Sequence, residues 1–104
     1  MKRLPVIIPP KVRDQIREQM LYIARDSIDR ALAWKDRVQA AILAIGTMPG
    51  HAIDEDAADR IGETLRKLVS EGTYLIHYRV DEAAATVQIV NIRHGARLPR
   101  ADEP

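Results

Sequence analysis

The chain of 104 residues contains no cysteine. It therefore has no disulfide framework, no thiolate nucleophile and no cysteine-based zinc site. This absence fits a protein that stays in the reducing cytoplasm. The length leaves room for one domain. We predict that it spans residues 1–104, with a core from about 4 to 98 and a short tail at 99–104.

Long apolar runs are also missing. Lys2 and Arg3 precede an apolar stretch that is too short and too rich in proline to be the core of a signal peptide. Nothing in the chain approaches the roughly 18 apolar residues that a membrane-spanning helix needs. We therefore expect a soluble, cytoplasmic protein that has no membrane partner.

The common signatures of catalytic and cofactor sites are absent as well. The chain has no glycine-rich phosphate loop and no serine, histidine and aspartate arrangement of the hydrolase type. His51 and His77 have no carboxylate or second histidine at ligand spacing. The sequence therefore predicts neither a metal ion nor a cofactor.

Charge is nearly balanced, with a formal net charge of +1, but it is unevenly distributed. Residues 54–59 carry four acids and no base, whereas residues 91–100 carry no acid. The cationic and titratable side chains of that second stretch are Arg93, His94, Arg97 and Arg100. A separated basic end and acidic loop would steer a charged partner. The alternative is an ordinary solvated surface.

The first half of the chain predicts a short strand followed by a helical hairpin. The strand covers Leu4–Ile8, and Pro5 places it at a sheet edge. A helix over Lys11–Arg25 and a second helix between the N-cap Ser27 and the stop at Gly46 follow. Their short connection makes them antiparallel. The predicted buried stripes are Val12, Ile16, Met20 and Ile23 on the first helix, and Ile28, Leu32, Val38, Ile42 and Ile45 on the second, with Trp34 and Ala41 beside them.

The second half predicts three strands, preceded by a short helix from Asp54 to a stop at Gly62. The strands are Leu65–Val69, Thr73–Val80 and Thr86–Ile92. In the second strand Tyr74, Ile76, Tyr78 and Val80 share one face, while the third is apolar on both faces, as in a central strand. The fold class is α+β in the order β-α-α-β-β-β: an N-terminal strand, a helical hairpin and a three-stranded antiparallel meander. We expect the hairpin to pack on an antiparallel sheet of three or four strands.

Two segments of the second half resemble ParE-type toxins. They are residues 75–81 (LIHYRVD) and residues 87–97 (VQIVNIRHGAR), which are similar to a strand and a following "H-G-A-R" strand of that family. In the first half, the features that fit the family's helical hairpin are Asp14, the Tyr22–Ala24 triplet, Ala31 with Trp34, and Pro49-Gly50. The resemblance spans about Leu4 to Leu98.

The chain departs from the family pattern in two connections. Where the family has a short "G-R-P" loop after the hairpin, this chain has His51-Ala52-Ile53 and a longer acidic stretch. The usual "S-P-E-A" entry to the first helix is replaced by Pro9-Pro10-Lys11-Val12. These departures put local contacts in doubt and leave the expected RelE/ParE-like fold unchanged.

The resemblance implies the toxin of a type II toxin–antitoxin module, a plasmid stabilisation protein held inactive by a cognate antitoxin in a hetero-oligomer. In one branch of the superfamily the toxin poisons DNA gyrase by binding, which needs no catalytic group. We favour that branch and predict that Arg93, Arg97 and Arg100 contact the target. We expect no direct DNA binding without the antitoxin.

The alternative branch is a ribosome-dependent mRNA endonuclease of the RelE type. Its general acid or base would be His94, with Arg93 and Arg97 as phosphate ligands. RelE-like nucleases usually carry an arginine where Val69 stands, and a tyrosine or an added helix after the last strand. The arginine is missing here, and residues 98–104 contain no aromatic residue. A third possibility is a non-toxic protein of the same fold that acts only as a corepressor with its antitoxin.

Each candidate side chain also has a purely structural interpretation. His94 would bond to backbone at a strand end, and the arginines would be solvated or would pair with the acidic loop. Tyr78 and Trp34 are expected in the core. For the antitoxin, the candidate contacts are the edge strand Leu4–Ile8 and the outward side of the hairpin, reached by groove docking or strand addition.

Overall fold

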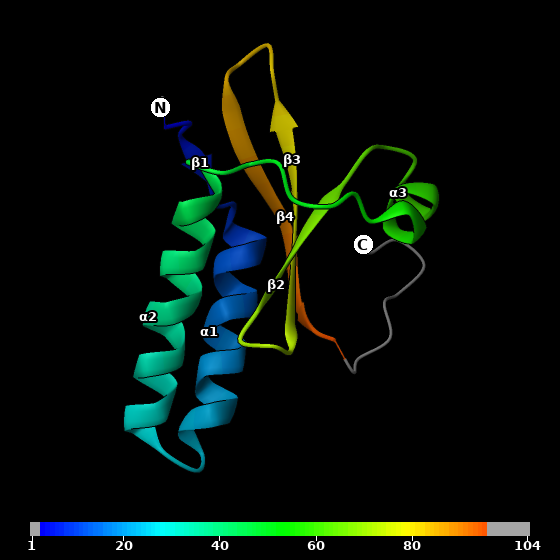
Figure 1. The fold of residues 1–104 in the computed structure, drawn as a ribbon. Helices are drawn as coiled ribbons and strands as arrows, with labels where there is room; N and C mark the ends of the chain where they lie inside the picture. Colours follow the sequence, from blue (N-terminus) through cyan, green and yellow to red (C-terminus); the bar gives the residue numbers. More distant parts are fainter. Residues whose placement is uncertain (1–2, 96–104) are drawn as a thin grey trace.

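A helical hairpin packs against one face of a four-stranded sheet (Figure 1). The computed structural model describes residues 3–95. The elements in chain order are β1 (Val6–Ile7), α1 (Pro10–Ala24), α2 (Ile28–Ile45), α3 (Glu55–Ile61), β2 (Arg66–Ser70), β3 (Tyr74–Asp81) and β4 (Thr86–His94). The predicted α+β order is confirmed, and the predicted short helix after Asp54 is present as α3. The predicted tail, residues 99–104, lies outside the described residues.

Local chemistry sets both ends of the hairpin helices. Pro10 occupies the first turn of α1, where its missing N–H leaves no bond unmade. The Ser27 hydroxyl caps α2 by accepting a hydrogen bond from the Arg30 amide at 3.2 Å. α2 ends before Gly46, where a Cβ atom would lie 2.4 Å from the Leu4 carbonyl oxygen. The N-terminal segment is thus able to cross the end of α2 only because this residue is glycine.

The buried stripe of α2 differs from the predicted one. Ile28 and Leu32 are 68% and 50% exposed. The residues that are buried follow one line along the helix: Ala31, Trp34, Val38, Ile42 and Ile45. At about 100° per residue, Leu32 lies about 120° from the middle of this line. The prediction was wrong for Ile28 and Leu32 because the tip of the hairpin also extends past the end of the sheet (Figure 1).

The sheet has the order β1-β4-β3-β2. β2, β3 and β4 form the predicted antiparallel meander. β1 lies at the edge as predicted, but it pairs with β4 in parallel, with Val6 opposite Val87. The prediction of an entirely antiparallel sheet was therefore wrong for β1. A parallel neighbour needs a long crossover connection, and α1 and α2 lie between β1 and the meander.

Gln15 of α1 forms hydrogen bonds to β4 at residues that do not pair with β1. The Gln15 amide oxygen accepts a hydrogen bond from the Ile92 amide at 2.9 Å, and its nitrogen donates to the Asn91 side chain at 2.8 Å. Beside these residues the register shifts between His77 and Tyr78 of β3, so that Val90 is left without a partner on β3. The two hydrogen bonds of Gln15 thereby fix the position of α1 along β4, next to this β-bulge.

The core lies between the hairpin and one face of the sheet, which we refer to as the hairpin face. Tyr74, Ile76 and Tyr78 of β3 are buried there, as the alternation predicts, and the rings of Trp34 and Tyr74 are 5.1 Å apart. β4 is central and buries Val87, Ile89 and Ile92. None of the helices in residues 3–95 combines the length and the hydropathy needed to cross a membrane.

Neighbouring residues of α2 test which side of the helix carries the core. Ile42 is fully buried, and Ile42→Ala should lower the free energy of unfolding by about 2–5 kcal/mol, because it leaves a cavity between hairpin and sheet. Leu43 is 51% exposed, and Leu43→Ala should change it by about 0.5 kcal/mol or less. Urea unfolding measures both. Equal losses would contradict the packing described above.

Candidate functional site

The segment Ala52–Leu65, which we call the α3 segment, covers the sheet face opposite the hairpin (Figure 1). α3 begins after Asp54, whose side chain accepts a hydrogen bond from the Ala57 amide at 3.2 Å. It ends at Gly62, which has a φ of 83° and so occupies the left-handed region that favours glycine. Both boundaries agree with the prediction.

Backbone bonds fasten this segment to the outer edge of β2. The Asp54 amide donates to the Leu65 carbonyl at 2.9 Å, and the Lys67 amide donates to the Ala52 carbonyl at 3.0 Å. Ile53 and Arg66 form an isolated antiparallel bridge. Ala57 and Leu65 are fully buried. The segment therefore satisfies part of a sheet edge and also excludes water from the face below it.

A buried histidine–aspartate hydrogen bond joins the segment to β3. His77 points to this face, which we call the α3 face, because it alternates with the core residues Ile76 and Tyr78. It is fully buried, and its Nε2 lies 2.8 Å from the Asp54 carboxylate. The two residues are 23 positions apart, so no spacing rule applied to the sequence could have paired them. The prediction that His77 has no carboxylate partner holds only within the local sequence.

The environment of this pair favours a neutral imidazole beside an ionised carboxylate. Burial lowers the pKa of His77 below its ordinary 6.5, and Arg93 and Lys67 lower it further, against the opposing effect of Asp54. Burial raises the pKa of Asp54, but hydrogen bonds from His77 and the Ala57 amide, together with the charge of Lys67, bring it below its ordinary 3.8. The imidazole then donates its Nε2 proton to the carboxylate.

Tyr78 holds the loop that leads into the α3 segment. The ring is buried in the core as predicted, but its hydroxyl is also in use. It donates to the Pro49 carbonyl at 2.5 Å and accepts from the His51 amide at 3.1 Å. Arg66 donates to the His51 carbonyl at 2.7 Å. Burial raises the pKa of Tyr78, so the hydroxyl stays protonated and acts as a structural donor.

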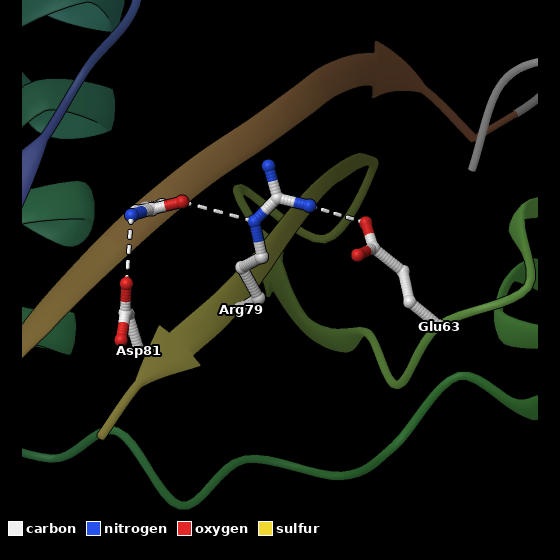
Figure 2. A network of polar contacts seen from close by, with 4 residues as sticks. Glu63, Arg79 and Asp81 are labelled. Atoms are coloured by element: carbon white, nitrogen blue, oxygen red, sulfur yellow. Dashed lines mark hydrogen bonds and ion pairs between the residues drawn. The ribbon is translucent and has the colours of Figure 1, made fainter. Parts of the chain in front are cut away.

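Cationic side chains surround His77 on the α3 face. Lys67 is its direct neighbour on β2, and Arg79 lies two residues farther along β3. Figure 2 shows the Arg79 guanidinium turned toward Glu63, with which it forms an ion pair. Arg79 also donates to the Gln88 side chain at 3.0 Å, and Gln88 in turn reaches Asp81. The acids of the α3 segment are thus interleaved with the cations of the sheet.

The structure places the two described site candidates on different faces of β4. His94 pairs with Tyr74, and its ring lies edge-on to the Tyr74 ring at 5.3 Å on the hairpin face. Arg93 pairs with Leu75 and lies on the α3 face, where its charge acts on His77. Arg97 and Arg100, the other two candidates, lie outside the described residues.

A groove of about 310 Å³ lies between α1 and α2. Its apolar lining comes from Ile8, Ile16 and Met20, and its polar lining comes from Arg13, Arg17, Lys35 and Gln39. Within the described part of the chain, none of the three cations forms an ion pair with a carboxylate. Ile8 belongs to the edge strand that the sequence analysis named as a candidate antitoxin contact, but the groove itself could not be identified from the sequence, because both helices are needed to form it.

Comparison with known proteins agrees with the resemblance described above. The family model for the ParE toxin of the type II toxin–antitoxin system parDE matches residues 6–99. No match is found among curated proteins. Within residues 3–95, no three histidine or acidic side chains are grouped so that they could hold a metal ion.

The protein should become less stable as the pH falls below about 6.5. The folded pKa of His77 lies below the unfolded value, so between the two the unfolded chain binds more protons, and acidification favours unfolding. Asp54 contributes little in this range because its folded pKa is below 3.8. Urea unfolding at about pH 7.5 and about pH 5.5 should show the loss in the unaltered protein and a smaller loss in His77→Gln.

The matched control is His51→Gln, which alters a histidine at the adjoining loop and should keep the pH dependence of the unaltered protein. A His77→Gln variant with the same loss of stability on acidification would show that another group is responsible.

Proposed function

The chain belongs to the ParE toxin family of type II toxin–antitoxin systems, and on this premise we propose that it poisons DNA gyrase. As a member of the family it is a toxin component whose partner is a cognate antitoxin. Gyrase poisoning requires a surface that binds the topoisomerase and no catalytic group of the toxin itself. Both gyrase and the antitoxin would be met in the cytoplasm, where we expect the protein to act.

His94 and Arg93 lie on opposite faces of β4, and this supports gyrase over messenger RNA as the target. A metal-independent ribonuclease needs a proton-transfer group and phosphate-binding cations within reach of one scissile bond. His94 and Arg93 are consecutive in a strand, so one side chain faces the hairpin and the other faces the α3 segment. His77 is fully buried and is bonded to Asp54, which keeps it from substrate. The described residues thus offer a binding surface more readily than an active site.

The surface proposed for the target lies at the end of β4 on the α3 face. Arg93 stands there on β4, and Lys67 lies on β2 on the other side of β3. Arg97 and Arg100 follow in the sequence and belong to the proposal on the sequence alone.

Induction of the toxin without its antitoxin should stop DNA synthesis before protein synthesis, with induction of the DNA-damage response. The double variant Arg93→Ala, Arg97→Ala should lose this effect while it still binds the antitoxin, because the proposed target contact is removed and the hairpin is untouched. Pulse labelling of DNA and protein side by side after induction measures the order.

The control for this experiment is Arg25→Ala, Arg30→Ala, which removes two exposed cations from the hairpin and should remain toxic. Early arrest of protein synthesis would transfer the assignment to the endonuclease branch and make His94, Arg93 and Arg97 catalytic suspects. A folded Arg93→Ala, Arg97→Ala variant with full toxicity would remove the proposed contact surface. Normal growth after induction would favour the corepressor.

The groove between α1 and α2 supports a docking site for the antitoxin. Its lining combines apolar side chains with the cations Arg13, Arg17 and Lys35, so an acidic segment with apolar anchors is complementary to it. Ile8 lines the groove and directly follows β1, whose Ile7 is 47% exposed at the sheet edge. A partner chain that fills the groove can therefore continue along the edge strand.

Charge reversal in the groove should weaken antitoxin binding. For Arg17→Glu with Lys35→Glu we expect a loss of affinity on the order of 10-fold or more, because the new acids repel an acidic segment. Calorimetry with the purified antitoxin measures the affinity, and the rise in melting temperature that the antitoxin causes gives a second readout. Arg25→Glu with Arg30→Glu is the matched control, and an equal loss in the control would argue against the groove.

A further inference from the structure

The α3 face presents cations on three adjacent strands. Lys67 lies on β2, Arg79 on β3 and Arg93 on β4, and all three are half-buried. Lys67 stands beside His77, whereas Arg79 and Arg93 are displaced from it in opposite directions along the strands. This arrangement spreads positive charge over three strands of the sheet. It suits a chain of repeated phosphates better than one carboxylate.

Acids of the α3 segment already occupy this surface. Glu63 pairs with Arg79, and Asp54 lies on His77 close enough to Lys67 for the lysine charge to affect it. Glu55, Asp56 and Asp59 are exposed on the outer side of α3. Charges within roughly 8–10 Å act on one another at physiological salt, so Glu63 and Asp54 reduce the attraction of the surface for other anions.

We propose that the α3 segment is an electrostatic cover that keeps nucleic acid off the sheet face carrying Lys67, Arg79 and Arg93. Asp54 and Glu63 take the places that phosphate groups would occupy, and the buried Asp54–His77 bond with the β2 edge bonds holds the cover in place. The cover thus gives a physical reason for the expected lack of direct DNA binding. The inference does not depend on gyrase being the target.

The cover also discriminates between a free polyanion and a protein partner that carries cations of its own. A free polyanion must displace or tolerate the acids of the segment, which costs affinity through repulsion of like charges. A partner that brings its own cations would be attracted to Glu55, Asp56 and Asp59 as it approaches Arg93. The same segment therefore disfavours bare nucleic acid while it leaves a mixed protein surface able to bind.

Neutralising the cover without loosening it tests this inference. The triple variant Glu55→Gln, Asp59→Asn, Glu63→Gln changes exposed acids and leaves Asp54 bonded to His77. The probe is a fluorescein-labelled oligothymidylate about 20 nucleotides long, and fluorescence anisotropy at about 50 and about 200 mM salt measures binding. We expect the variant to bind at least about 10-fold more tightly than the unaltered protein, with a steeper salt dependence.

The matched control has the same change in net charge at other exposed acids: Asp26→Asn, Asp29→Asn, Glu82→Gln. It should bind the oligonucleotide no more than about 2–3-fold more tightly than the unaltered protein. Adding Lys67→Gln to the cover variant should remove most of the gain. Equal binding by the two triple variants, or a gain that survives Lys67→Gln, would overturn the inference.

The single variant Glu63→Gln guards against misfolding, because it removes one exposed ion pair and leaves Arg79 bonded to Gln88. It should raise affinity for the oligonucleotide by about 2–3-fold, and melting curves of all variants should coincide with that of the unaltered protein to within a few degrees. A folded Glu63→Gln protein that binds no better, together with an unchanged cover variant, would show that the segment does not act as a cover. Toxicity plays no part in the readout, so the gyrase proposal and this one fail separately.

Discussion

Strand β3 is buried on both of its faces, and the remaining structure follows from the two different ways in which these faces are covered. On one face Ile76 and Tyr78 meet the apolar stripes of the hairpin, which is the ordinary driving force of a small domain. On the other face His77 is buried, and water is excluded by a short segment instead of a second helical layer. A titratable side chain at such a position needs a partner, and Asp54 supplies it.

Asp54 therefore joins several parts of the structure, although it lies in a connecting segment. Its carboxylate caps α3 and accepts a hydrogen bond from His77, and its amide donates a hydrogen bond to the Leu65 carbonyl. Each of these bonds satisfies a group that would otherwise be left unpaired as water is excluded. The longer acidic connection, which departs from the usual pattern of the family, is thus a packed element with its own contacts to the sheet.

The two covered faces also separate the surfaces proposed for function. The groove with Arg13, Arg17 and Lys35 belongs to the hairpin, while Arg93 lies across the sheet beside the α3 segment. A partner in the groove and a target at the end of β4 would touch different layers of the domain. Neutralisation by an antitoxin bound only in the groove would then require its chain to reach around the sheet edge at β1, which lies beside the groove.

Features governed by short stretches of chain could be predicted from the sequence alone. Ser27 and Asp54 cap helices through bonds to amides three residues later, and alternation in β3 places Ile76 in the core, because both effects act within one turn or one pleat. The meander and the edge position of β1 also followed from such patterns, whereas the family followed from the resemblance of two segments to its members. Only the tertiary structure decided the features that join distant residues. They are the parallel direction of β1, the choice of the buried side of α2, which leaves Leu32 exposed, and the Asp54–His77 bond. These depend on which surfaces meet once the chain has closed on itself, and no local periodicity contains that information.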